Sequence, residues 1–395
     1  MLLVTAWVVV CTQQNHMSVN PASRYATMES LVERGTWSID ESSLRTVDKV
    51  QVDGRMYSSK PPLMVALMTP AYVVVRAVQG FGFSENAYQT VRAMRLFVAV
   101  GPWLIAMFLW LGLVRRLSDD PLIQLWASTA MIAGGLSTAY ASHLDNHSVA
   151  MAALLAGAAL LAPLLRGQIA ATRALAGGLA WGFATTCDLG AIPAVGLVGS
   201  VGLWLVRADR RAALALLIGL LAAPIAQTIL LLMMTGDPRP FYLRDGLYNY
   251  AGSYWRNPIE FDALDEPWPL YAFHSLIGHH GLFSATPWLL LAIPWFLRRE
   301  DTDAAELVRK ATIGATLFVV AYYTLRTSNY GGRCVGMRWY MVLHPILAVA
   351  SVRTVVRRNL VQRRPLLLGA LTGWSTMNAL LGAINPWEEG LVYAT

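Results

Sequence analysis

The sequence predicts an all-α integral membrane protein, a polytopic bundle of about 11 transmembrane helices in one domain over residues 1–395. Hydrophobic residues make up 55% of the chain and charged residues only 14%, whereas a soluble domain carries about 25% charged residues. The mean hydropathy is +0.45. Long apolar runs recur from end to end, and no stretch between them is large enough to form a separate soluble core. Water is therefore not the main solvent of this chain.

A helix needs about 20 mostly apolar residues to cross a bilayer. Ten stretches of this kind follow the start of the chain, at 92–114, 121–141, 147–165, 173–187, 189–206, 212–234, 283–297, 311–325, 339–352 and 365–384. Residues Met1 to Thr12 are apolar but too short to span, and no charged residue precedes them as it would in a signal peptide. We expect them to belong to a first transmembrane helix shortened at its start.

The apolar stretch Pro61 to Val78 could cross the bilayer or lie along its surface, and the distribution of basic residues decides between these. If it does not cross, most Lys and Arg clusters between the later spans fall on one side, which identifies that side as the cytoplasm. The opposite connections near residues 143–147, at Asp188 and beyond Trp387 contain no Lys or Arg, while the turn from Arg326 to Arg338 holds three. We therefore expect a juxtamembrane or re-entrant helix that begins at the Pro-Pro pair.

Net charge and cysteine content exclude two classes of function. The formal charge is +7 and the pI is about 9.4, but the basic residues form short clusters between apolar runs and do not make a nucleic-acid-binding surface. Nucleic acid is therefore not an expected partner, whereas membrane lipids are. The three cysteines are too dispersed for a disulfide framework or a zinc site of recognisable spacing.

Two large polar segments are predicted on the non-cytoplasmic side. The first external loop, residues 13–91 with its juxtamembrane helices, has its polar part in residues 13–60, and the second loop covers residues 235–282. Both are rich in acids, bases and aromatic residues, so we expect the chemistry of the protein to take place on this face.

Short motifs in these segments resemble a known superfamily. They are Asn20-Pro-Ala-Ser-Arg24-Tyr25, Leu31-Val-Glu-Arg-Gly35-Thr-Trp, Tyr57-Ser-Ser-Lys60-Pro61-Pro62-Leu63 and Asn329-Tyr-Gly-Gly332-Arg-Cys-Val-Gly336-Met-Arg338-Trp-Tyr340. The first three are similar to the first external loop of GT-C glycosyltransferases of the protein mannosyltransferase and lipid A aminoarabinose transferase superfamily. The last is similar to a Gly-x-Arg-Tyr turn before a late helix in bacterial members. The fold that this resemblance implies is a GT-C-like helical bundle.

The resemblance implies an enzyme of the bacterial inner membrane whose active site faces the periplasm or exterior. Such an enzyme moves a hexosyl or pentosyl group from a polyprenyl-phosphate-linked sugar, such as an undecaprenyl phosphate derivative, to a lipid, glycan or protein acceptor. The reaction inverts the sugar configuration and uses a loop carboxylate as general base. No cofactor is required, because Lys and Arg can neutralise a single phosphate; a divalent metal would be compatible with the site, and its ligands are unknown.

The sequence departs from the superfamily at the base. Where aminoarabinose transferases carry Asp-Glu-Thr before Arg-Tyr, this chain has Pro21-Ala22-Ser23, so the base must lie elsewhere or the enzyme is inactive. Asp48 and Asp40 are the candidates, because both lie between the Arg24 segment and Lys60. Either acid could instead cap a turn or pair with a nearby Arg.

Four residues are candidates for binding the donor phosphate. Lys60 stands before a Pro-initiated helix at headgroup depth, where it could also be a snorkelling lysine. Tyr57 could assist by hydrogen bonding or belong to the interfacial aromatic belt. Arg333 and Arg338 are cations on the side poor in positive charge, within a Gly-rich turn. A salt bridge to a loop acid would account for these two equally well.

Several further polar residues could have either a functional or a structural role. Asp145 and the neighbouring His147 could contact the acceptor or hold a metal, although Asp145 is also a typical helix N-cap, as is Asp188. His279 and His280 are adjacent, and adjacent residues on a helix point about 100° apart and seldom bind one ion. Loop packing is therefore the expected role of this pair.

The rival function is a non-enzymatic protein that binds or flips polyprenyl-linked sugars. A flippase should carry ionisable groups along its spans to pass a polar head. Between residues 92 and 234 the predicted spans hold few such groups beyond Arg92 and Arg95, and most of the charge lies in the external loops. This distribution favours chemistry at the surface.

Overall fold

The computed structural model describes residues 1–13, 17–166, 169–327 and 329–387. In these ranges the chain is helical apart from one hairpin and its loops. The N-terminal part contains α1 (Leu2–Cys11), α2 (Val19–Arg34), β1 (Lys49–Val52), β2 (Arg55–Ser58), α3 (Pro62–Gln79) and α4 (Phe83–Arg95). The central part contains α5 (Gly101–Leu117), α6 (Pro121–Ile132), α7 (Leu136–Ala139), α8 (Asn146–Leu161), α9 (Ala171–Cys187), α10 (Ala191–Leu205) and α11 (Arg210–Thr235). The C-terminal part contains α12 (Trp268–Leu276), α13 (Leu282–Ala285), α14 (Ile293–Phe296), α15 (Asp303–Arg326), α16 (His344–Arg358), α17 (Leu360–Arg363) and α18 (Pro365–Gly382).

The predicted apolar stretches all fall on helical segments, but the predicted number of spans is not established. Five helical segments among the described residues are long and apolar enough to cross a membrane: Pro62–Gln79, Phe83–Leu117, Asn146–Leu165, Arg210–Thr235 and Arg338–Arg358. Other apolar helices are shorter, and the stretches at 121–141 and 283–297 are each broken into short helices. The integral membrane class therefore stands, while the count of about 11 stays a prediction.

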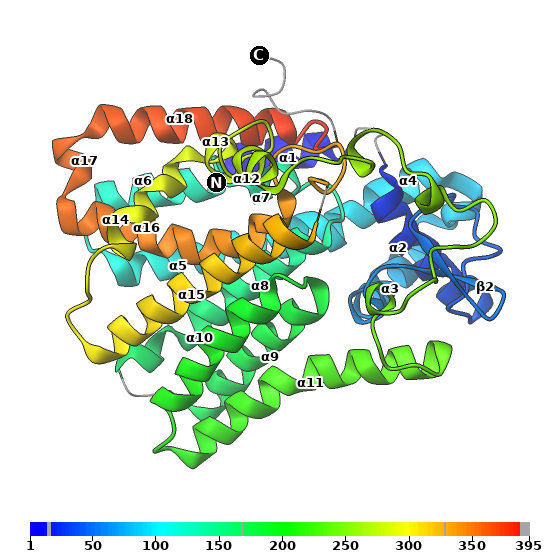
Figure 1. Cartoon of the computed structure of the whole chain (residues 1–395), viewed down its shortest axis with the longest axis horizontal. Helices are drawn as coiled ribbons and strands as arrows, with labels where there is room; N and C mark the ends of the chain where they lie inside the picture. The colour runs from blue at the N-terminus through cyan, green and yellow to red at the C-terminus, as the bar shows by residue number, and fades with distance from the viewer. Residues whose placement is uncertain (14–16, 167–168, 328, 388–395) are drawn as a thin grey trace.

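The first external loop forms a compact group at one end of the molecule. Figure 1 shows α2, α3, α4 and β2 together at the right, beyond the ends of the bundle helices drawn at the left. Within this group the phenol of Tyr72 in α3 donates to Glu33 of α2, and its ring stacks on Phe83 of α4 at 4.5 Å between centroids. The helix predicted at Pro61 to Val78 exists and begins at the Pro-Pro pair, and its surface position stays a prediction.

A short β-hairpin was missing from the all-α prediction. β1 and β2 pair antiparallel with Val52 opposite Arg55, so the loop between them is Asp53-Gly54. Both loop residues have positive φ, 49° and 79°, as the type I′ turn of a two-residue hairpin requires. The Asp-Gly pair, with Val50 and Val52 alternating before it and Met56 after it, is the signal that identifies this turn in the sequence.

The second external loop lies at the same end as the first. The hairpin residues Val50, Val52 and Tyr57 form an apolar cluster with Leu231 of α11 and Phe241 of the loop that follows. Two hydrogen bonds also join the loops. The Gln51 amide donates to the backbone oxygen of Leu247 at 3.0 Å. The Trp255 indole donates to the backbone oxygen of Val47 at 3.2 Å. Residues about 200 positions apart thus build one polar face.

Several of the basic residues predicted to be cytoplasmic lie together as well. Arg353 and Arg357 of α16 both contact Glu300 at 2.6 Å, and Arg116 at the end of α5 donates to the last turn of α8. Arg116, Glu300 and Arg353 line one largely apolar groove of about 600 Å³. The prediction that these segments share one side agrees with this arrangement, while the orientation in the membrane stays a prediction.

The bundle depends on close backbone contact between α9 and α11. Gly178 and Gly182 are four residues apart on one face of α9, the small-xxx-small spacing of packed membrane helices. A Cβ added at Gly178 would lie 2.6 Å from the carbonyl oxygen of Leu216, and one at Gly182 would lie 2.6 Å from that of Leu220. Only glycine permits this approach.

We predict that Gly182→Val destabilises the protein by about 1–3 kcal/mol, because the added atoms meet the backbone of α11, which cannot move aside as a side chain can. Gly196→Val in α10 is the matched control, since no atom lies within 4 Å of a Cβ added there. Thermal unfolding in detergent measures both variants. Equal unfolding temperatures for the two would contradict the packing described.

Candidate functional site

Arg24 connects the first external loop to the bundle. Its side chain is fully buried, and Nη1 donates to the backbone oxygen of Asn20 at 3.0 Å and also to the Asn20 side chain. Nη2 donates to Oδ1 of Asn146, the first residue of α8, at 2.6 Å. A buried guanidinium therefore lies between α2 and the start of a bundle helix.

Lys60 and Asp48 form an ion pair next to α2. Lys60 Nζ lies 2.8 Å from Asp48 Oδ2, and Asp48 is buried. The hydroxyl of Ser23, one residue before Arg24, donates to the backbone oxygen of Asp48 at 2.6 Å and lies 2.6 Å from the hydroxyl of Ser58. These hydrogen bonds place the backbone of Asp48 beside the segment Pro21-Ala22-Ser23.

Arg338 comes from the far end of the sequence to the same region. Nη1 lies 3.5 Å from Oδ1 of the buried Asp145, and Nη2 donates to the backbone oxygen of Gly331 at 2.6 Å. Its guanidinium carbon lies 4.9 Å from the ring centroid of Trp387. Gly331 has φ +87°, and a Cβ there would lie 3.0 Å from Arg338 Nε. The turn can hold Arg338 in this way only with glycine at that position.

The three cations Arg24, Lys60 and Arg338, which we call the cation cluster, influence one another. Burial lowers the pKa of Lys60, Asp48 raises it in opposition, and the charges of Arg24 and Arg338 lower it further. Burial also lowers the pKa of Arg24 to about 10, against the charges of Asp145 and Asp48. The structure thus brings the predicted phosphate ligands Lys60 and Arg338 into one site, together with Arg24.

Two guanidinium N–H groups of the cation cluster are buried without an acceptor. Within the part of the chain that the structure describes, no hydrogen-bond partner lies in reach of Nε of Arg24 or Nε of Arg338. Buried donors in folded proteins are almost always satisfied, and exceptions indicate a missing water, ion or ligand. The cluster has three cations near the acids Asp48, Asp145 and Asp262, and either a water or an anion could be the missing partner.

His147 and Asp188 form a second buried pair beside the cation cluster. His147 Nδ1 lies 2.5 Å from Asp188 Oδ2, and the other oxygen of Asp188 accepts from the amide of Gly190 at 2.9 Å and the phenol of Tyr323 at 3.2 Å. A carboxylate held in this way fixes the ring orientation of its histidine. His147 can therefore present Nε2 as a hydrogen-bonding atom.

Asp145 is both a helix cap and a partner of the cluster. Oδ2 accepts from the amide of Ser148 at 3.1 Å, which confirms the N-cap interpretation. Burial alone would raise the pKa of Asp145, but His147, Arg338 and Arg24 together lower it below the usual value. Asp145 is thus a permanent counter-charge of the cluster. No third ligand joins Asp145 and His147 among the described residues, so their metal role stays a prediction.

Other predicted site residues lie outside these contacts. Asp40 is exposed, and its two oxygens accept from the hydroxyl of Ser38 at 2.5 Å and the amide of Met56 at 3.0 Å. Tyr57 is buried in the apolar cluster of the hairpin. Arg333 is exposed on the turn before Arg338. The printed contacts of Asp40 and Tyr57 give them structural roles, and functional roles for all three residues stay predictions.

Sequence reasoning did not assign a role to Arg24, a member of the cluster, or to Asp262, whose charge interacts with the cluster. The sequence did mark Arg24, because Arg24 belongs to the Arg-Tyr motif that resembles the GT-C superfamily. Asp262 of the second loop accepts from the phenol of Tyr254 at 3.0 Å. Burial raises the pKa of Asp262, Asp48 raises it further, and the cations Arg338 and Lys60 lower it. No signal in the sequence distinguishes Asp262 from the other acids of that loop.

Comparison with known proteins identifies the fold. No family model and no curated protein matches this chain. The crystal structure of ArnT from Cupriavidus metallidurans in the apo state is similar with a TM-score of 0.54 and 14% identity over 97% of this chain and 75% of that one. The structure of the same protein bound to undecaprenyl phosphate gives a TM-score of 0.51 and 13% identity over the same shares. The resemblance to the aminoarabinose transferases is confirmed at the level of the fold.

We predict that Asp48→Asn shifts the titration of Lys60 to lower pH, because Asp48 is the group that raises the pKa of this buried amine. Only the neutral amine reacts with acylating reagents, so the yield of Lys60 modification against pH, read by mass spectrometry, measures the change. Asp53→Asn in the exposed hairpin turn is the control and should leave the midpoint in place. A midpoint unchanged in Asp48→Asn would contradict the ion pair.

Proposed function

We propose that this chain is a membrane glycosyltransferase that takes a sugar from a polyprenyl-phosphate donor and passes it to a lipid, glycan or protein acceptor at the outer face of a bacterial inner membrane. The observation that carries the proposal is the buried cation cluster with its two unsatisfied N–H donors. It occurs on a fold similar to ArnT, and one ArnT structure contains undecaprenyl phosphate.

The donor phosphate fits the cation cluster in charge and position. Lys60 immediately precedes Pro61 and α3, and α3 exposes the apolar side chains of Leu67, Val74 and Val78. A phosphate held by Lys60 would therefore have an apolar helix face next to its prenyl chain. Arg24 and Arg338 add planar guanidinium groups, which suit phosphate oxygens better than a single ammonium does. These two guanidinium groups and the Lys60 ammonium can neutralise a single phosphate without a metal.

Asp48 is the proposed general base. Its backbone oxygen accepts a hydrogen bond from the Ser23 hydroxyl, which holds Asp48 beside Pro21-Ala22-Ser23, the segment that lacks the carboxylate of the aminoarabinose transferases. In the unliganded protein Asp48 is paired with Lys60. When the donor phosphate pairs with the Lys60 ammonium in place of Asp48, the Asp48 carboxylate becomes free to accept a proton.

The proposed reaction is a single displacement. Asp48 takes the proton of the acceptor hydroxyl, and that oxygen attacks the anomeric carbon as the bond between this carbon and the phosphate oxygen breaks. The electron pair of the broken bond leaves with the polyprenyl phosphate, whose charge Arg24, Lys60 and Arg338 stabilise. The sugar configuration is inverted, and no cofactor takes part.

The alternative is a protein that binds or flips the same lipid without transferring its sugar. The cation cluster would serve either function. The general base separates them, because a binding protein has no need of Asp48 once the phosphate has engaged Lys60. An assay of transfer and binding on the same variants therefore distinguishes the two.

We predict that Asp48→Asn lowers the rate of sugar transfer at least about 100-fold, while Asp40→Asn stays close to the wild-type rate because Asp40 is exposed and bonded within its turn. Membranes are incubated with a panel of radiolabelled polyprenyl-phosphate sugars, and binding of undecaprenyl phosphate to each variant shows that the site is intact. Binding without transfer in the wild type across the panel would favour the flippase. Loss in Asp40→Asn alone would transfer the role of base to Asp40.

We also predict that undecaprenyl phosphate binds more weakly as pH rises through the lowered pKa of Lys60, measured above about pH 7, where the phosphate is already doubly ionised. The pKa of Lys60 is lowered in the free protein, and a bound anion raises it, so binding takes up a proton. The affinity then falls by up to about tenfold per pH unit above the pKa of free Lys60. Lys60→Arg keeps its charge and should show a flat profile; a slope equal to that of the wild type would contradict this role of Lys60.

A further inference from the structure

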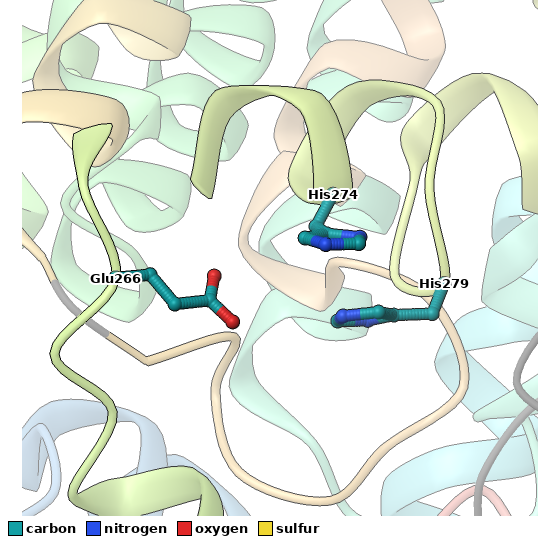
Figure 2. A group of neighbouring side chains, drawn as sticks. All are labelled: Glu266, His274 and His279. Carbon is teal, nitrogen blue, oxygen red and sulfur yellow. The ribbon is translucent and has the colours of Figure 1, made fainter. Parts of the chain in front are cut away.

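A group of metal-ligating side chains lies in the second external loop, outside the cation cluster. Glu266 stands just before α12, His274 lies in α12, and His279 follows it. One ligand atom from each lies within 4.8 Å of the other two, and all three residues are half-buried. Figure 2 shows the two imidazole rings stacked with the carboxylate of Glu266 facing them. The sequence did not predict this set, because its three members are 8 and 5 residues apart and only the fold brings them together.

The distances fit one small cation after a modest adjustment. Bonds of about 2.0–2.1 Å to a tetrahedral zinc place neighbouring ligand atoms roughly 3.3 Å apart. The rings of His274 and His279 are stacked, with centroids 4.0 Å apart at an angle of 20°, so both rings must turn to aim their in-plane nitrogen lone pairs at one ion. Ligand atoms within 4.8 Å must approach by at most about 1.5 Å, which side-chain rotation supplies.

The surroundings of His274 support a ligand role. Its Nδ1 is buried, and no hydrogen-bond partner lies in reach among the described residues. A Cβ added at Gly278 would lie 2.4 Å from this atom, so the loop passes the ring only because residue 278 is glycine. A buried imidazole nitrogen without a partner calls for an explanation, and a bound cation provides one.

The carboxylate also has an orienting partner. The phenol of Tyr330 donates to Oε2 of Glu266, and its ring stacks on Tyr271 of α12 and on His280, each at 4.8 Å between centroids. Groups of this kind fix the direction of metal ligands. Tyr330 is followed by Gly331, whose backbone oxygen accepts from Arg338. The cluster is thus one residue away from the turn that positions a cation of the phosphate site.

We propose that Glu266, His274 and His279 bind one Zn²⁺ ion, with a fourth position open to water. Two imidazoles and one carboxylate are a ligand set typical of zinc, whereas magnesium and calcium prefer oxygen ligands alone. The ion holds Glu266 in place, and the hydrogen bond from Tyr330 to Glu266 connects it to the turn that positions Arg338. Metal binding does not depend on the proposed transferase activity, because it is measured without donor or acceptor.

The test uses the full chain in detergent, stripped of metal with a chelator and titrated with Co²⁺ and Zn²⁺. We expect one ion per chain, a Co²⁺ absorption spectrum typical of imidazole ligands, and a higher unfolding temperature with Zn²⁺. Glu266→Gln, His274→Gln and His279→Gln should each weaken binding at least about tenfold, since even the loss of an orienting group costs that much. Asp265→Asn, which removes an exposed acid next to Glu266, is the matched control and should bind as the wild type does.

Two results would overturn the proposal. One is a wild-type protein that shows no stoichiometric binding and no thermal shift with either metal, which needs no variant and is independent of folding. The other is unchanged affinity in both His274→Gln and His279→Gln, which would place any metal elsewhere.

Discussion

The arrangement of this protein depends on the burial of like charges at one end of a membrane bundle. Arg24, Lys60 and Arg338 are all largely removed from solvent. Their positive charges repel one another in a region where water screens little. Asp48 and Asp145 offset part of the cost. A buried ion pair often contributes no more stability than apolar residues of the same volume would. Because burying three cations is costly, their presence at one site is consistent with the negatively charged ligand proposed above.

The fold makes this concentration of charge achievable by bringing distant segments to one place. Arg24 reaches Asn146 across 122 positions of sequence, and Arg338 reaches Asp145 across 193. Behind them, close glycine contacts between α9 and α11 hold the bundle together, and the hairpin packs against the end of α11. A rigid base of packed helices and a polar cover formed by two loops suit a reaction between a membrane lipid and an acceptor from the aqueous side.

The sequence predicted those features that are local. Apolar runs identified the helices, the Pro-Pro pair identified the start of α3, and short motifs indicated the ArnT-like fold. It could not rank Asp48 above Asp40 with any force, because the difference lies in the contact of Asp48 with Lys60 and Ser23, which depends on how α2 packs on the hairpin. The β-hairpin has an Asp-Gly turn signal in the sequence, but each of its strands is only four residues long in a chain whose composition predicts helices.

The central claim is that Arg24, Lys60 and Arg338 bind one phosphate. A structure of the chain determined by electron cryomicroscopy with undecaprenyl phosphate bound tests it most directly. The account predicts the phosphate within hydrogen-bonding distance of all three side chains, with Nε of Arg24 or Arg338 now satisfied and Asp48 separated from Lys60. A phosphate bound elsewhere, with the ion pair between Asp48 and Lys60 intact, would contradict it.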